Sequence, residues 1–192
     1  MTIAAFDLDG TLSEHDTLVP FLRRAVGTPR TAWCLACNVP WFVRARRDRA
    51  LRDAAKEALL VATIAGRRED DMRKIGASFA PTVTYRDDVL SMLRGHQRAG
   101  HTTVVVSASP TIYVDAIAAH LGIDHVVSTE LEVVDGKLTG KYVGENCRAE
   151  EKARRLRSWL AARGVLDEEL HAYGNPPDDE PMLALATVPV RV

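Results

Sequence analysis

The chain has 192 residues, with 25 Lys or Arg, 26 Asp or Glu and 46% apolar residues. This length is typical of one compact domain with room for an inserted subdomain. The ordinary apolar share argues against a disordered chain, and the balanced charge argues against a nucleic-acid-binding protein with a uniformly basic surface.

Three cysteines are too few, and odd in number, for a disulfide framework, so we expect a reducing, cytoplasmic compartment. The first residues lack the basic segment of a secretory signal. The longest uncharged stretch, residues 31–43, has 13 residues, well short of the roughly 20 that cross a bilayer. We therefore expect no membrane span.

Three apolar runs alternate with helical patterns, which predicts an α/β fold whose parallel sheet is covered on both faces. The predicted strands are Ile3–Phe6, Thr102–Val106 and His171–Tyr173. The polar residues that follow them include Asp7, Ser107 and Asn175. Because ligands bind at the carboxyl ends of such strands, these three positions should converge on one site.

About 95 residues separate the first two predicted strands, far more than one crossover helix needs. The stretch from Asp16 to Tyr85 is rich in Ala, Arg and Leu and has apolar residues at helical spacing. We expect residues 16–85 to form an inserted helical cap, and residues 1–15 and 86–192 to form the core domain.

After the insertion, the chain again alternates helices and strands. Helices are predicted over 86–99, 111–121 and 149–163, and strands over 125–128 and 188–192. Asp135-Gly136 lies between two short apolar segments and predicts a β-hairpin, because Asp-Gly supplies the positive φ angles of a tight turn.

Asp7-Leu8-Asp9-Gly10-Thr11 follows the first predicted strand. Two carboxylates at a strand end suit Mg²⁺, which favours oxygen ligands from one or two carboxylates together with a substrate phosphate. Gly10 allows the chain to turn sharply. The alternative interpretation is a turn without chemistry, since Asp and Gly are common turn residues.

The Asp-Leu-Asp-Gly-Thr segment after a buried strand resembles motif I of the haloacid dehalogenase (HAD) superfamily of phosphatases. Val-Ser-Ala-Ser at 106–109 resembles motif II, and Lys152 resembles the lysine of motif III. Gly-Asn-Pro-Pro-Asp-Asp at 174–179 matches motif IV in part. The helical insertion, the hairpin and Pro181-Met182-Leu183 resemble subfamily IB, the phosphoserine phosphatase-like branch with a type-1 cap inserted between motifs I and II.

The resemblance implies a Rossmann-like HAD fold and a Mg²⁺-dependent phosphomonoester hydrolase that forms an aspartyl phosphate. It makes Asp7 the nucleophile and Asp9 the general acid and base. The implied catalytic residues are Asp7, Asp9, Ser107 and Lys152. The implied phosphate-binding or substrate-binding residues are Gly10, Thr11, Asp16, Ser107, Ala108 and Lys152. The implied magnesium ligands are Asp7, Asp9, Asn175 and Asp179.

Two of these positions leave alternatives open. Asp16 occupies the position of a Glu that meets the substrate amine in phosphoserine phosphatases, which favours a small, amino-bearing substrate, but Asp16-Thr17 also suits a helix N-cap. Asn175 stands where the family usually has an Asp. An amide oxygen has no formal charge, so Mg²⁺ should bind more weakly unless Asp178 or Asp179 compensates.

The charges are unevenly distributed along the chain. Residues 21–56 contain nine Lys or Arg against two Asp, a net charge of +7, and residues 166–181 carry a charge of −6. A basic cap over an acidic site suits an anionic substrate or peripheral contact with lipid headgroups, although a solvated helix face is the commoner reason for such a run.

Other cap residues favour structural roles. The apolar residues Trp33, Val39, Trp41, Phe42 and Val43 predict a packed cluster between cap helices, and Cys34 and Cys37 predict two small buried side chains. Two functional alternatives stay open beside the small-metabolite phosphatase: a phosphatase for lipid-linked phosphates such as phosphatidylglycerol phosphate, and a phosphate-binding or regulatory protein weakened by Asn175.

Overall fold

The computed structural model describes residues 1–44 and 48–192, without the side chains of residues 39–44 and 49. Its main sheet has five strands, in the order β3-β2-β1-β6-β7, and every neighbouring pair is parallel. The strands are β1 (Thr2–Phe6), β2 (Thr102–Pro110), β3 (His125–Thr129), β6 (Glu169–Gly174) and β7 (Val188–Arg191). The predicted α/β fold with a parallel sheet is confirmed.

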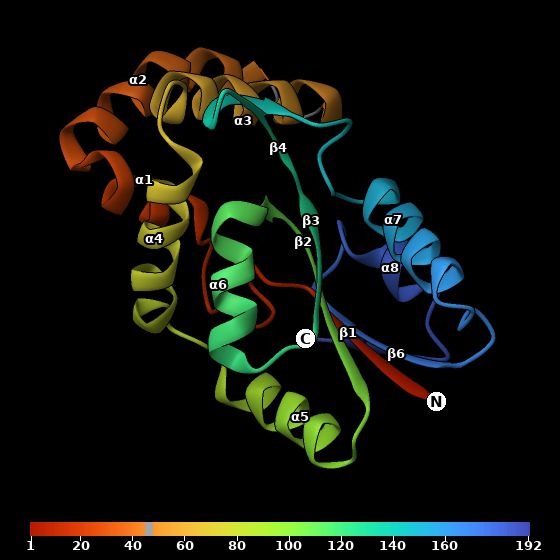
Figure 1. Cartoon of the computed structure of the whole chain (residues 1–192). Coiled ribbons are helices and arrows are strands. Elements are labelled where there is room, and N and C mark those ends of the chain that lie inside the picture. The colour runs from red at the N-terminus through yellow and green to blue at the C-terminus, as the bar shows by residue number, and fades with distance from the viewer. Residues whose placement is uncertain (45–47) are drawn as a thin grey trace.

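Helices cover both faces of this sheet (Figure 1). On one face lie α5 (Asp87–Arg98) and α6 (Thr111–Leu121), and on the other lie α7 (Glu150–Ala162) and α8 (Glu180–Leu183). Alternate residues of β1 enter the two apolar clusters: Ala4 and Phe6 pack on the α5–α6 side, whereas Ile3 and Ala5 pack on the α7–α8 side. A strand buried on both faces must be apolar throughout, which explains the first run of the sequence.

The segment between β1 and α5 is helical in its described part. It contains α1 (Leu18–Val26), α2 (Thr28–Arg44), α3 (Arg49–Ile64), α4 (Glu69–Phe79) and a 3₁₀ turn at Ala80–Thr82. Asp48 begins α3, because its carboxylate accepts hydrogen bonds from the amides of Ala50 and Leu51. Phe21 and Leu60 join these helices to the apolar cluster of α6. The division into a core and a cap domain remains a prediction.

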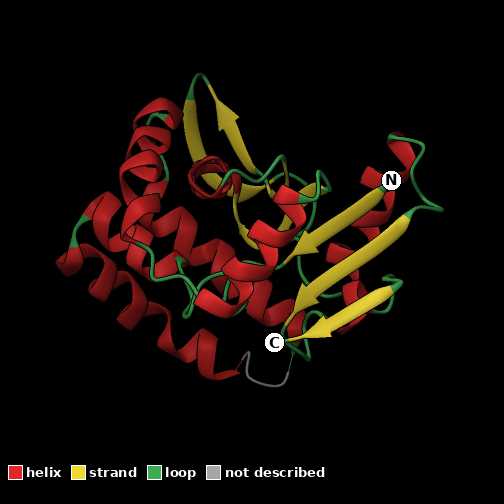
Figure 2. Cartoon of the chain, turned by 90° about the horizontal axis from the view of Figure 1, so that it is seen from below, coloured by secondary structure: helices red, strands yellow, loops and turns green. Residues whose placement is uncertain are grey.

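The predicted hairpin forms from β4 (Leu131–Val134) and β5 (Lys137–Tyr142), and Asp135 and Gly136 take positive φ angles of 50° and 71°. Figure 2 shows it projecting beside the helical segment. It packs on α3 so closely that a Cβ on Gly140 would lie 2.5 Å from Val61 Cα. The hairpin therefore packs against a helix that precedes it by about 70 residues in the chain.

The structure corrects two predictions for α2. Trp33 is 72% exposed, so it does not pack in a cap core. Cys34 is buried as expected, but Cys37, one turn later on the same helix, is exposed. The side chains of Val39, Trp41, Phe42 and Val43 lie outside the described residues, so the predicted cluster is not described.

Two strands exceed their predicted length by more than one residue. β2 continues to Pro110 with a register shift after Ser107, and β6 starts at Glu169. Among the residues that the structure describes, no helix is long and apolar enough to cross a membrane.

Candidate active site

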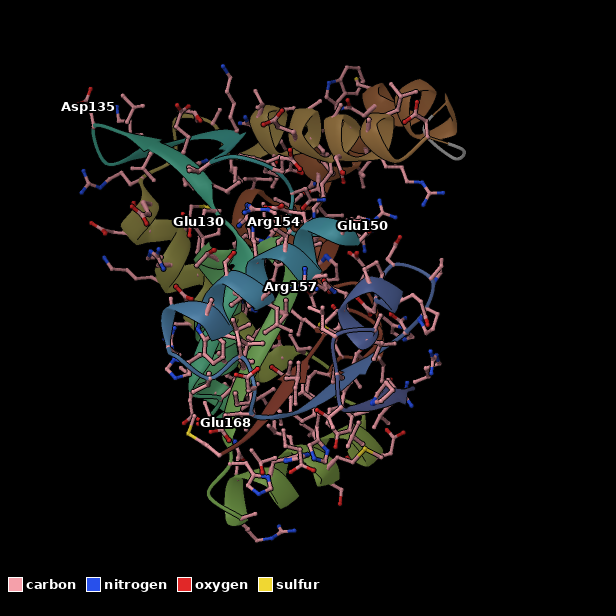
Figure 3. The ribbon with its side chains drawn as sticks, turned by 90° about the vertical axis from the view of Figure 1, so that its right-hand side faces the viewer. Glu130, Asp135, Glu150, Arg154, Arg157 and Glu168 are labelled. Carbon is pink, nitrogen blue, oxygen red and sulfur yellow. The ribbon has the colours of Figure 1, made fainter. Side chains whose placement is uncertain are left out.

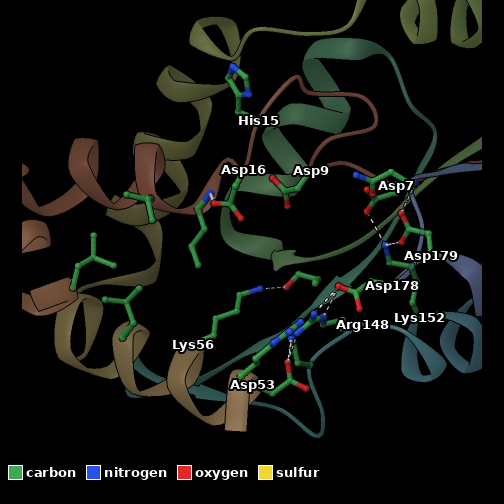
Figure 4. A pocket seen from close by; sticks show the side chains of 18 residues that line it. Asp7, Asp9, His15, Asp16, Asp53, Lys56, Arg148, Lys152, Asp178 and Asp179 are labelled. Carbon is green, nitrogen blue, oxygen red and sulfur yellow. Dashed lines mark hydrogen bonds and ion pairs between the residues drawn. The ribbon is translucent and has the colours of Figure 1, made fainter. Parts of the chain in front are cut away.

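Three charged side chains meet at the carboxyl ends of the strands. Asp7 follows β1, Lys152 lies in the first turn of α7, and Asp179 precedes α8. The Lys152 ammonium donates to Asp7 Oδ1 at 2.6 Å and also to Asp179 Oδ1 (Figure 4). Thr11 donates to the other Asp7 oxygen, at 2.9 Å. Two predicted catalytic residues, 145 positions apart, are thereby in direct contact.

This Asp7–Lys152–Asp179 triad is almost completely buried, with side chains 7%, 4% and 2% exposed. Burial raises the pKa of Asp7 from 3.8 to about 7; Lys152 opposes the rise, and Asp179 and Asp9 add to it. Burial acts to lower the pKa of Lys152, but the two carboxylates outweigh it and raise that pKa. The triad holds two carboxylates and one ammonium, and its surplus negative charge suits a divalent cation.

The Asp9 carboxylate is held by three donors. Its Oδ1 accepts from the amide and the hydroxyl of Thr17 at 2.7 and 2.6 Å, and its Oδ2 accepts from the hydroxyl of Ser109 at 2.6 Å. The Thr17 hydroxyl also lies 3.1 Å from the hydroxyl of Tyr113. No role in the site was predicted for Thr17, Ser109 or Tyr113; the second serine of Ser-Ala-Ser was the available signal.

Motif II lies at the end of β2, as predicted. Ser107 is fully buried, and its Oγ accepts from the amide of Ser109 at 3.0 Å. Ala108 lines a pocket that also has Asp7, Asp9 and Lys152 in its wall. The Ala108 carbonyl accepts from Thr129 Oγ1 at 2.7 Å and from Lys56 Nζ at 2.8 Å. Lys56 is a cap-segment residue, so this contact joins α3 to the motif.

Asn175 lies beside the triad and donates its backbone amide to Asp179 Oδ2 at 2.9 Å. Gly10 has a φ of 80°, and a Cβ there would lie 2.7 Å from Asn175 Nδ2. Of the two acidic residues considered as compensation for Asn175, only Asp179 belongs to the triad. Asp178 instead accepts two hydrogen bonds from Arg148, at 3.0 and 2.5 Å.

Asp16 lines the same pocket and also begins a helix. Its Oδ1 accepts from the amide of Leu18 at 3.0 Å, whereas the N-cap residue, Thr17, makes no side-chain cap bond. Desolvation raises the pKa of Asp16, and the Asp9 carboxylate adds to the rise. The Asp16 side chain therefore accepts a hydrogen bond at the start of α1, as the helix-start interpretation expects. Asp16 also remains part of the pocket wall.

A second set of polar contacts links α3 to the core beside the pocket. Asp53 accepts from Asn146 Nδ2 at 2.6 Å and lies 3.9 Å from an Arg148 nitrogen. Figure 4 shows Arg148 between Asp53 and Asp178. The pocket has a volume of about 780 Å³ and includes Asp7, Asp9 and Lys152 in its wall.

The side chains on the outer face of α7 are arranged differently from Lys152. Figure 3 shows Arg154 and Arg157 on this helix, which lies over the sheet. Arg154 and Arg155 both donate to Glu151, at 2.6 and 2.7 Å. Glu151 thus pairs with arginines of its own helix, whereas Lys152, the next residue, donates to Asp7 and Asp179 in the site.

The comparisons with known proteins agree with this geometry. A family model described as haloacid dehalogenase-like hydrolase matches residues 4–184. The chain belongs to this family. It is 35% identical over 188 residues to Protein CicA of Caulobacter vibrioides, covering 96% of this chain and 82% of that protein. It is 36% identical to a phosphoserine phosphatase of Streptomyces coelicolor over 126 residues, which is 66% of this chain but only 30% of that protein.

A solved structure has the same fold over nearly the whole chain. A Bordetella pertussis protein of unknown function superposes with a TM-score of 0.83 at 27% identity, covering 97% of this chain and 87% of that chain. The chain is therefore a HAD hydrolase with phosphoserine phosphatase-like relatives, and assignment to subfamily IB fits them.

The donor set at the site also fits the metal that the family uses. No group of three or more His, Cys, Asp or Glu side chains in the described residues forms a ready-made metal site. The ligands implied for Mg²⁺ do not form such a cluster, because they are the Asp7 carboxylate, the Asp9 backbone carbonyl and the Asn175 amide oxygen. Water and substrate phosphate complete the shell of Mg²⁺ in such sites.

Proposed function

We propose that this protein is a Mg²⁺-dependent phosphomonoester hydrolase that works through an aspartyl phosphate. The supporting observation is the buried Asp7–Lys152–Asp179 triad at one side of a pocket, with Asp9 in the same pocket. Asp7 attacks phosphorus as the bond to the leaving alcohol breaks, and Asp9 protonates that alcohol. Asp9 then takes a proton from water, which attacks the aspartyl phosphate and releases phosphate.

The other residues bind and orient the reactants. Lys152 neutralises charge on the nucleophile and the phosphoryl group. Ser107 and the Ala108 amide bind phosphate oxygens, and Thr11 fixes the Asp7 carboxylate for attack. Asp7, the Asp9 carbonyl and Asn175 would hold Mg²⁺, with Asp179 adjacent. When bound, Mg²⁺ screens the repulsion between the nucleophile and the phosphate.

A substrate screen tests this proposal. The panel contains phosphoamino acids, amino-alcohol phosphates, sugar phosphates and lipid phosphates, each assayed for phosphate release over a range of Mg²⁺ concentrations. Mg²⁺-stimulated release supports the proposal, and a preference for amino-bearing substrates supports a role for Asp16. Binding of phosphates without hydrolysis at any Mg²⁺ concentration would instead identify a regulatory protein.

The three free cysteines fit a reducing, cytoplasmic location.

Asn175→Asp is expected to lower the Mg²⁺ concentration for half-maximal activity by on the order of tenfold, because a charged ligand binds the cation more tightly than an amide. The measurement is phosphate release against Mg²⁺ concentration. Asp178→Asn is the comparison variant, since Asp178 pairs with Arg148 and should leave the half-maximal concentration unchanged. An unchanged value in Asn175→Asp would remove this residue from the metal shell.

Mg²⁺ is expected to stabilise the protein more at about pH 8 than at about pH 5.5. Because the folded-state pKa of Asp7 is raised from 3.8 to about 7, the folded protein holds this proton more tightly than the unfolded chain, and the associated stability falls as the pH rises through that interval. Mg²⁺ binds the ionised carboxylate and offsets the loss at high pH.

Thermal unfolding with and without Mg²⁺ at both pH values measures this effect. The shift in Tm should be larger at high pH by roughly 3 °C or more. Asp7→Asn is the control and should lose the difference. Equal shifts at both pH values in the wild-type protein would contradict the expectation.

A further inference from the structure

The pocket extends beyond the catalytic carboxylates to an apolar end formed by the cap segment. Leu18 and Val19 contribute from α1, Leu35 from α2 and Leu59 from α3. Leu18 and Leu59 are buried, while Val19 and Leu35 are half-buried. Three separate helices thus supply apolar side chains to one wall of the cavity that contains Asp7.

Polar groups separate this apolar end from the triad. Asp16 lies two residues before Leu18 in the chain, and Lys56 lies on the same face of α3 as Leu59, one turn earlier. Figure 4 shows Asp16 and Lys56 on the side of the pocket away from Asp7. The pocket therefore has its catalytic groups on one side, and on the other the apolar residues with charged neighbours, which also include Arg52.

The size of the pocket exceeds what a phosphoryl group and a small polar alcohol require. Its volume of about 780 Å³ falls in the range, roughly 300 to 1,000 Å³, of sites that enclose ligands as large as typical drugs. With a small polar substrate, the apolar end would hold only water beside leucine and valine side chains. Filling it with hydrocarbon releases that water, which favours binding.

We propose that the leaving group of the substrate is an alcohol with an apolar chain or ring, which the apolar end of the pocket binds. This inference rests on the proposed phosphatase function and specifies its substrate class: amphiphilic phosphomonoesters. The same chemistry occurs in a dissolved amphiphile and in a lipid presented by a membrane, and the test below separates the two.

The test is the hydrolysis of straight-chain alkyl monophosphates, from ethyl to octyl, by the full chain with Mg²⁺. Each added methylene should lower KM by roughly fourfold, the equivalent of about 0.8 kcal/mol, until the apolar end is filled. The value of kcat should stay nearly constant, because this binding is the same in the ground state and the transition state.

A pair of variants on α2 assigns the effect to the pocket. Leu35→Asn should reduce the octyl-to-ethyl ratio of kcat/KM by at least about tenfold, since it places an amide in the apolar end. Ala36→Asn is the matched control, because Ala36 is exposed, is absent from the pocket wall and is adjacent on the same helix. The control should keep the wild-type ratio.

The outcomes distinguish this inference from the proposed function. Hydrolysis of every alkyl phosphate with the same KM, or an unchanged ratio in Leu35→Asn, overturns the inference and leaves the phosphatase proposal standing. No hydrolysis of any alkyl phosphate by a protein that hydrolyses another member of the substrate panel overturns the inference alone, whereas no hydrolysis of the alkyl phosphates or of any panel member overturns the phosphatase proposal itself. A long-chain phosphatidic acid in phosphatidylcholine vesicles, compared with dissolved octyl phosphate, identifies the source: faster turnover in vesicles indicates a membrane lipid, and slower turnover indicates a soluble amphiphile.

Discussion

Asp7→Asn is expected to release phosphate at least about ten-thousandfold more slowly than the wild-type protein, because an amide is a poor nucleophile toward phosphorus. The fold should persist. The substitution removes one of two carboxylates that share a single ammonium, so Lys152 keeps Asp179 as a partner. Phosphate-release assays report the loss, and circular dichroism with thermal unfolding reports the fold.

A carboxylate far from the pocket provides the control for this variant. Asp88 is 56% exposed on α5 and pairs with Arg86, so Asp88→Asn should retain wild-type turnover. An Asp7→Asn protein whose turnover stays within about tenfold of wild type would remove Asp7 as the nucleophile, whatever its stability.

Lys152→Met should both abolish turnover and destabilise the fold. It leaves Asp7 and Asp179 buried without their cation, and breaking a buried ion pair from one side costs about 3 to 5 kcal/mol in the free energy of unfolding. The cost should be smaller near pH 5, because Asp7, with a pKa already raised to about 7, takes up a proton.

Urea unfolding at about pH 7.5, with and without Mg²⁺, measures this cost. Mg²⁺ should restore part of the stability, since it supplies positive charge to the same carboxylates. The double variant Lys152→Met/Asp179→Asn should be more stable than the single variant, because it removes one of the stranded charges. A single variant within about 1 kcal/mol of wild type without Mg²⁺ would show that the triad is not electrostatically coupled.

The strand ends could be predicted from sequence because the signal is local. Ile3–Phe6 is apolar throughout, as a doubly covered strand must be, and the parallel topology then brings Asp7 and Asn175 to one edge. Lys152 was located only through the resemblance of its motif. A lysine is usually exposed, and nothing in its local sequence shows that two carboxylates surround it.

The remainder depends on how distant segments approach one another. Thr17 and Ser109 contact Asp9 only because the start of α1 and the end of β2 meet above it. The exposure of Trp33 follows from which side of α2 faces its neighbours, and a helix with apolar residues on several sides does not indicate that side. Gly140 was the one residue in the hairpin that could have indicated its packing on α3. Only the fold shows why a glycine stands there, since a Cβ would lie 2.5 Å from Val61 Cα.

Through the hairpin, which packs on α3, two further passages of the chain connect the cap segment to the core. Besides the passages before α1 and after the 3₁₀ turn, the chain runs into β4 from β3 through Glu130 alone, and it returns from β5 through residues 143–149 to α7. This linker also contacts α3, because Asn146 donates to Asp53 at 2.6 Å and Arg148 lies 3.9 Å from the same carboxylate. The helix that carries Lys152 is therefore joined to the strand that packs on α3 by only seven residues, 143–149, so the position of the catalytic lysine depends on how α3 and the hairpin are packed.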